Sequence, residues 1–227
     1  MSTAARRTST SSDPSASSTS SSSDGGDHTR PTTRPATRPA TRRGLTARDL
    51  ALVAAFCALI VALVPVKVPV GGAAPIVLQN LGIMLAGAVL GARRGFLAVL
   101  LFVVLAVAGL PVLASGVRGL AIFTGPTVGF VVGYPVVALV IGLLVQRFLP
   151  RLHVMAAVGA CLVGGIVVSY ALGIPGMAWR SAKLDLAGAA TFSATFLPGD
   201  LVKAVVAGVV ATAVHKALPD LVPARRR

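Results

Sequence analysis

Long apolar runs, separated by short polar or glycine- and proline-rich gaps, fill most of the chain after Leu45. Because a helix needs about 20 residues to cross a bilayer, these runs predict an all-α membrane protein, a bundle of about six transmembrane helices. The second and third runs are the shortest, and Gly91-Ala92-Arg93-Arg94-Gly95 separates them. The predicted helices cover residues 48–65, 76–92, 95–110, 126–148, 153–173 and 199–217.

Residues 1–44 differ from the rest of the chain, because they are rich in Ser, Thr, Pro and Arg and contain no apolar run. Such a composition cannot bury enough apolar surface to offset the entropy lost on folding. We therefore expect a disordered, basic cytoplasmic tail over 1–44, a six-helix membrane domain over 45–220 and a short basic tail over 221–227. The first tail has no apolar stretch with a cleavage site, so we do not expect a signal peptide.

The composition supports lipid as the solvent. Charged residues make up 12% of the chain and hydrophobic residues 55%, whereas soluble domains carry about 25% charged residues. The formal net charge of +14 would by itself fit nucleic-acid binding. We exclude that class, because the basic residues lie in the tail and in the gaps between apolar runs and are not interleaved with aromatic residues.

The gap cations also predict the orientation, since membrane proteins concentrate Lys and Arg on the cytoplasmic side. With the N-terminus inside, the inner flanks hold eleven basic residues: Arg42, Arg43, Arg48, Arg93, Arg94, Arg147, Arg151, Lys216, Arg225, Arg226 and Arg227. The outer loops hold four: Lys67, Arg118, Arg180 and Lys183. This excess predicts a multi-pass protein of the cell membrane with both termini in the cytoplasm.

Candidate catalytic chemistry is sparse. The three histidines are His28, His153 and His215, and none lies beside Asp200 in the predicted arrangement. The two cysteines lie inside apolar runs and suit buried packing. No nucleophile–base pair or metal cluster can be assembled from these residues, so we expect no enzyme, no cofactor and no metal. A non-transporting membrane scaffold remains an alternative class, and a channel is disfavoured because no ring of like charges is present.

Asp200 and Lys203 are the most informative polar residues, because they stand at the start of an apolar helix. A charge at the bilayer centre costs about 2.5–3.5 kcal/mol on insertion scales. Two interpretations are open. In the first, Asp200 caps the helix that begins near Pro198 and pairs with Lys203 one turn later. In the second, which we favour, Lys203 binds a ligand carboxylate and Asp200 accepts hydrogen bonds from ligand N–H groups near the outer surface.

Two further polar features also permit two interpretations each. Gln79 and Asn80 lie at the outer end of the second helix and suit either ligand recognition or a hydrogen bond between helices. Arg118 is the only charge in the glycine-rich segment 109–133 and suits either a solvated loop or contact with an anionic ligand. Residues 174–198 are expected to form a long outer loop, and loops of that length are often lids.

Several short motifs occur along residues 46–217 in a fixed order. They are Ala74-Pro75-Ile76-Val77-Leu78-Gln79-Asn80-Leu81, Met84-Leu85-Ala86-Gly87, Leu90-Gly91 with Gly95, Gly109-Leu110-Pro111-Val112, Gly125-Pro126-Thr127, and Pro198-Gly199-Asp200 with Lys203. Each motif alone is weak, but the ordered set is specific. The set resembles the BioY family, the substrate-capture (S) components of energy-coupling-factor (ECF) vitamin transporters.

The resemblance implies the six-helix S-component fold and a protein that captures biotin at the outer face and carries it inward. It implies that Asp200 and Lys203 contact the ligand. Together with the polar residues considered above and the Thr of the Gly125-Pro126-Thr127 motif, the expected substrate-binding residues are Asp200, Lys203, Gln79, Arg118 and Thr127.

The resemblance also implies partners. Alanines recur every four residues in the first helix, and small residues let helices approach closely in lipid. They suit packing within the bundle or a docking face, and by resemblance Ala54 and Ala58 face a membrane-embedded T component. That component would carry two ABC-type ATPases, so ATP chemistry would lie in other chains.

Four positions depart from the family pattern. Val117 and Val131 stand where some relatives have an Asn and an Arg that contact biotin. Val128 and Phe130 replace the second Gly and the Tyr of the family's Gly-Pro-Thr-Gly-Gly-Tyr motif. An S component for a different vitamin on the same fold is therefore the alternative function.

Overall fold

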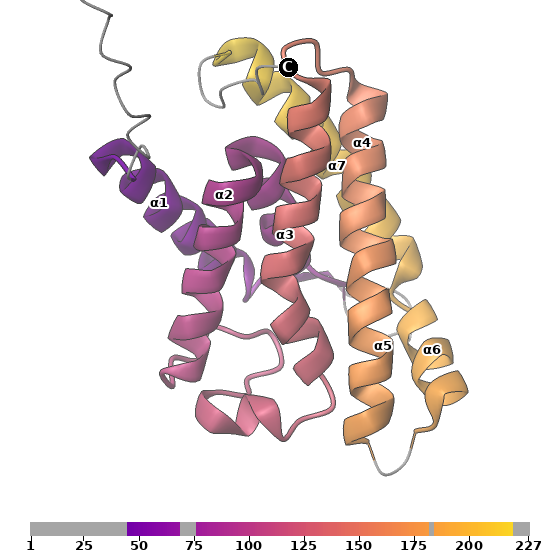
Figure 1. Ribbon diagram of the computed structural model, residues 1–227. Coiled ribbons are helices and arrows are strands. Elements are labelled where there is room, and N and C mark those ends of the chain that lie inside the picture. The colour runs from indigo at the N-terminus through magenta and orange to yellow at the C-terminus, as the bar shows by residue number, and fades with distance from the viewer. Residues whose placement is uncertain (1–44, 69–75, 182–183, 220–227) are drawn as a thin grey trace, which may run out of the picture. The chain divides into compact units, whose positions relative to one another are not determined.

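The computed structural model describes residues 45–68, 76–181 and 184–219, and the tails expected over 1–44 and 221–227 lie outside the described residues. Within these described ranges, one pair of two-residue strands, β1 (Lys67–Val68) and β2 (Ile76–Val77), accompanies the helices. The helices are α1 (Ala47–Leu63), α2 (Gln79–Val107), η1 (Gly119–Phe123), α3 (Val128–Phe148), α4 (Val154–Leu162), η2 (Val163–Val168), α5 (Ser169–Arg180), α6 (Leu186–Ala194) and α7 (Leu197–Ala217) (Figure 1).

Four helical stretches in the described part of the chain are long and apolar enough to cross a membrane. They are α2, α3, the continuous run 154–180 made by α4, η2 and α5, and α7. The first helix, α1, has 17 residues. Because α2 reverses direction within its length, it contributes two arms, and the described part of the bundle contains six apolar helical segments. The predicted all-α bundle of about six helices is confirmed.

The reversal in α2 occurs at Gly91, whose φ of 77° and ψ of 179° lie in a region that is essentially restricted to glycine. Nine residues of straight helix would span about 13 Å, yet a Cβ built on Gly95 would lie 2.7 Å from the carbonyl oxygen of Ala86. The predicted break over 91–95 is therefore confirmed. The first arm begins at Gln79 rather than at residue 76, because residues 76–77 form β2.

Small residues allow the neighbouring helices to pack against this turn. A Cβ on Gly142 of α3 would collide with the backbone of Ala92, and one on Gly87 would lie 2.6 Å from the carbonyl oxygen of Ala138. Close backbone approach through small residues is how helices associate in lipid. The fully buried Phe102 packs in the same core.

Polar contacts bind the N-terminus of α1 and the C-terminus of α7 to the same turn. Thr46 and Asp49 form a capping box at the start of α1, and Arg94 Nε lies 2.7 Å from Asp49 Oδ1. His215 Nε2 lies 2.9 Å from the carbonyl oxygen of Ala88. Both contacts lie near the helix ends that the charge pattern assigns to the cytoplasmic side.

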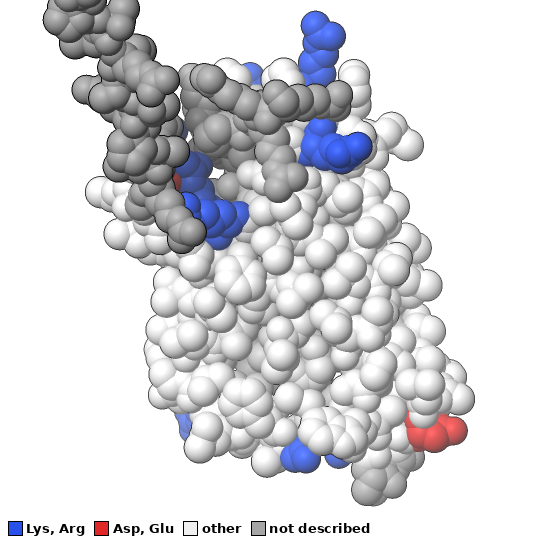
Figure 2. All heavy atoms as spheres, viewed as in Figure 1, with Lys and Arg blue, Asp and Glu red and all other residues white. Residues whose placement is uncertain are grey.

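The surface matches the expected solvent. Figure 2 shows Lys and Arg at the two ends of the face in view, with an uncharged band across its middle. Exposed leucines and valines recur along α7, including Leu201, Val205 and Val209. Such a band is the surface that a bilayer core requires.

The expected outer loop over 174–198 is corrected by the structure. The α5 helix continues through Pro175 to Arg180, and α6 occupies most of the remainder. The start of α6 is set by Asp185, whose Oδ1 accepts a 2.8 Å hydrogen bond from the backbone N–H of Gly188. An N-cap of this kind stabilises even a short helix.

Gly91→Ala is expected to destabilise the detergent-purified protein by about 1–3 kcal/mol, because the added Cβ is strained at this φ and ψ. Thermal unfolding followed by circular dichroism measures the change. Gly159→Ala is the matched control, since its Cβ would meet nothing within 4 Å and alanine favours the helix. Equal losses in the two variants would contradict a special role for the turn.

Candidate functional site

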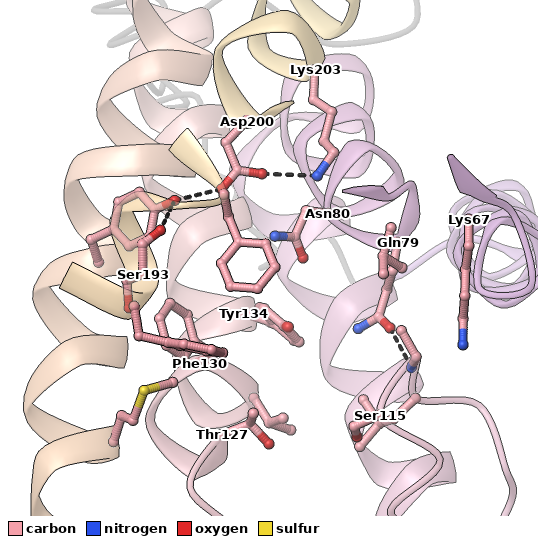
Figure 3. A pocket seen from close by; sticks show the side chains of 18 residues that line it. Lys67, Gln79, Asn80, Ser115, Thr127, Phe130, Tyr134, Ser193, Asp200 and Lys203 are labelled. Atoms are coloured by element: carbon pink, nitrogen blue, oxygen red, sulfur yellow. Dashed lines mark hydrogen bonds and ion pairs between the residues drawn. The ribbon is translucent and has the colours of Figure 1, made fainter. Parts of the chain in front are cut away.

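A cavity with a volume of about 360 Å³ lies among α2, α3, α5, α6 and α7 (Figure 3). Its volume falls in the range of small-molecule sites. Its polar and tyrosine lining residues are Lys67, Gln79, Asn80, Ser115, Thr127, Tyr134, Tyr170, Ser193, Asp200 and Lys203. Its apolar lining residues are Val77, Leu113, Ala114, Phe130, Val131, Met177, Phe192 and Phe196.

The polar centre of the cavity is a cluster made by Asp200, Lys203 and Tyr170. Lys203 Nζ lies 2.9 Å from Asp200 Oδ1, and the Tyr170 hydroxyl donates a 2.8 Å hydrogen bond to Asp200 Oδ2. Asp200 and Lys203 are 4% and 6% exposed. Each carboxylate oxygen therefore has a donor, which offsets the cost of burying the charge.

The start of α7 places this cluster. Pro198 stands in the first turn of the helix, and Asp200 is the acidic residue of that turn, where the positive end of the helix dipole favours a negative charge. The spacing of three residues puts Lys203 on the same face. The structure is compatible with both interpretations of this pair, helix capping with an ion pair and ligand binding, because the ion pair forms and both of its members line the cavity.

Gln79 also lines the cavity and is 2% exposed. Its Oε1 accepts a 2.9 Å hydrogen bond from the backbone N–H of Ala114, which connects the start of α2 to the segment that follows α2. Its amide nitrogen keeps two N–H donors for a ligand. The hydrogen bond is thus between a helix and a loop, rather than between two helices.

Of the other residues predicted from the sequence, the structure places Thr127 in the cavity lining and the rest outside it. Thr127 lines the cavity from the N-cap position of α3, and its side chain makes no capping hydrogen bond. Arg118 is exposed, precedes η1 and is not among the residues that line the cavity. Ala54 and Ala58 are exposed on α1, outside the cavity lining. The binding roles of these residues remain predictions.

Sequence reasoning missed most of the aromatic wall. Phe130 and Tyr170 pack edge to face with ring centroids 6.1 Å apart, as do Phe192 and Phe196 at 5.5 Å. Tyr170 lies inside an apolar run, where an aromatic residue is typical of core packing, and Phe130 was noted there as a departure from the family motif. Phe192 and Phe196 were assigned to a loop, and α6 brings Phe192 to the cavity.

Ser193, also on α6, is a second missed residue. It is 2% exposed and lines the cavity, while its backbone carbonyl oxygen lies 3.3 Å from the Tyr170 hydroxyl, whose proton is donated to Asp200 at the shorter distance. Its Oγ has no hydrogen-bond partner within the described residues. A buried hydroxyl in this position can bond a polar ligand atom.

Comparison with known proteins gives consistent matches. The BioY family model matches residues 35–220. The biotin transporter BioY of Rhodobacter capsulatus is 48% identical over 168 residues, which cover 70% of this chain and 87% of the relative. The biotin transporter BioY of Rhizobium etli is 46% identical over 66% of this chain and 82% of the relative.

A solved structure matches as well. The crystal structure of the S-component for biotin from an ECF-type ABC transporter has a TM-score of 0.68 and 29% sequence identity, with coverage of 74% of this chain and 91% of that chain. The match extends the sequence similarity to the arrangement of the helices.

Tyr170→Phe is expected to destabilise the ligand-free protein by about 1–3 kcal/mol, because it removes a donor from a buried carboxylate. Chemical unfolding of the purified protein in detergent measures the loss. Tyr134→Phe is the matched control, since Tyr134 lines the same cavity and its hydroxyl makes no hydrogen bond within the described residues. If both substitutions cost the same, the hydrogen bond to Asp200 is not what stabilises the cluster.

Proposed function

The chain belongs to the BioY family, and from this premise we propose that it captures biotin at the outer face of the membrane and carries it inward as the substrate-specific component of an ECF-type transporter. The chain is a multi-pass membrane protein. The observation that carries the proposal is the buried Asp200–Lys203 pair in the wall of a ligand-sized cavity.

The chemistry of biotin fits this cavity. Its ureido group offers two N–H donors and a carbonyl acceptor, and its fused rings are apolar. Asp200 retains free lone pairs for N–H groups, while Lys203 and Gln79 retain donors for a carbonyl. The rings of Phe130 and Phe192 supply apolar surface for the fused ring system.

The proposed direction of transport follows from the positions of charges. We place both termini in the cytoplasm because the inner flanks hold the larger share of the basic residues. The cavity then opens toward the outer side, since Asp200 stands at the start of α7 and His215 near its cytoplasmic end. Biotin enters from outside, and the bundle reorients against its partner to release biotin inside.

The proposed partner is a membrane-embedded T component that carries ABC-type ATPases. Docking is supported by α1, where the alanines repeat at helical spacing and are all exposed: Ala47, Ala51, Ala54, Ala55, Ala58 and Ala62. Each of these side chains is exposed, which favours a docking face over packing within the bundle. Small residues permit close approach by a second helix.

Purified protein is expected to bind biotin and not thiamin or riboflavin in calorimetric titrations. Asp200→Asn paired with Lys203→Met is expected to weaken biotin binding by tenfold or more, on the order expected for charge-assisted hydrogen bonds. The double variant removes both charges together, because removing one leaves an uncompensated buried charge that costs about 3–5 kcal/mol.

The control for the titration is Asp185→Asn, which changes an exposed carboxylate outside the cavity lining and leaves a residue that still caps a helix. Binding of another vitamin in place of biotin would favour the alternative S component, consistent with Val131 in the cavity wall. A well-folded protein that binds no vitamin would contradict the proposal.

Ala58→Leu is expected to reduce co-purification with a co-expressed T component about tenfold and to leave biotin binding unchanged, because overpacking a helix contact costs about 1–3 kcal/mol. Ala213→Leu is the matched control, since Ala213 is equally small and exposed but lies on α7. If the α7 variant loses its partner and the α1 variant does not, the docking face is assigned to the wrong helix.

A further inference from the structure

Among the described residues, three charged side chains line the cavity: Asp200, Lys203 and Lys67. Asp200 and Lys203 neutralise each other at 2.9 Å. Lys67 makes no ion pair within the described residues. The described part of the cavity wall therefore has an excess of one positive charge before any ligand binds.

From this balance we infer that Lys67 binds the carboxylate of the ligand, while the Asp200–Lys203–Tyr170 cluster binds the polar group at its other end. This inference rests on the proposed function, because it assigns the two ends of biotin to opposite sides of one cavity. It gives the anionic valerate chain a counter-ion at a position that the sequence had assigned only to an outer loop.

The position of Lys67 supports this assignment. Lys67 lies on β1 opposite Val77 of β2, and Val77 also lines the cavity two residues before Gln79. The strand pair thus fixes the base of a long, flexible side chain beside the start of α2. In the view of Figure 3, Gln79 lies between Lys67 and the Asp200–Lys203 pair, and these residues all line the cavity.

Electrostatics disfavour Lys203 as the partner of the carboxylate. A ligand carboxylate at Lys203 would lie beside Asp200, and two negative charges would then compete for one cation. Lys67 is exposed, so a carboxylate there keeps part of its hydration and avoids the full cost of burial. The methylene stem of lysine is long enough to bring the charge to the rim while packing on apolar surface.

No other described cation competes for this role at the cavity. Arg118 is exposed and does not line the cavity, and Val131 occupies a lining position without a charge. Lys67 is therefore the lining cation, within the described residues, that has no anionic partner. A consequence is selectivity for a carboxylate over a neutral amide at the end of the ligand chain.

The test compares biotin with biotinamide, in which a neutral amide replaces the carboxylate, by titration of the full-length protein in detergent. Wild type is expected to prefer biotin by about tenfold, the order of a charge-assisted hydrogen bond. Lys67→Gln and Lys67→Met are expected to lower the affinity for biotin by a similar factor and to abolish the preference, with the affinity for biotinamide little changed. Lys67→Arg is expected to retain the preference.

Arg180→Gln is the matched control, because Arg180 is an exposed cation outside the cavity lining, and it is expected to alter neither affinity. A preference that persists in both neutral Lys67 variants, or a wild type that binds the two ligands equally, overturns the role of Lys67 and leaves biotin capture intact. A folded wild type that binds neither ligand overturns the proposed function and this inference together.

Discussion

The structure depends on one interaction, the ion pair between Asp200 and Lys203 inside an apolar bundle. Lipid offers no water to solvate these charges, so each needs a protein partner. The hydroxyl of Tyr170, on α5, donates a hydrogen bond to the second oxygen of the Asp200 carboxylate. This bond connects α7 to a residue that stands 30 positions earlier in the chain. A net-neutral cluster of this kind is compatible with the membrane and still exposes donors and acceptors to a ligand.

The remaining architecture holds that cluster in place. The turn at Gly91 brings both arms of α2 against α3 through Gly87 and Gly142. At the opposite end from the cluster, His215 and Arg94 anchor α7 and α1 to the same turn. Small residues inside the bundle and polar contacts at one end hold the helices together, while the cavity lies at the other end.

How much of the site could be predicted from the sequence depended on whether a residue stood out from its surroundings. Asp200 and Lys203 did, because charges are rare in apolar helices, and both line the cavity. Tyr170 did not, because a tyrosine in an apolar helix is typical of core packing, and Ser193 did not, because it lay in a segment that the sequence predicted as a loop. Lys67 was recognised as an outer charge, but its place beside the cavity depends on the pairing of β1 with β2.

The sequence by itself determined the solvent, the six apolar segments and a break within 91–95, because these follow from local composition and from helix length set against membrane thickness. It also determined the cluster's charged pair, since three residues along a helix define one face. The tertiary structure decided which distant residues meet: α6 in place of a loop, Tyr170 on Asp200, and Arg118 outside the cavity. These depend on helix packing, which is set by contacts between segments far apart in the chain and leaves no local pattern.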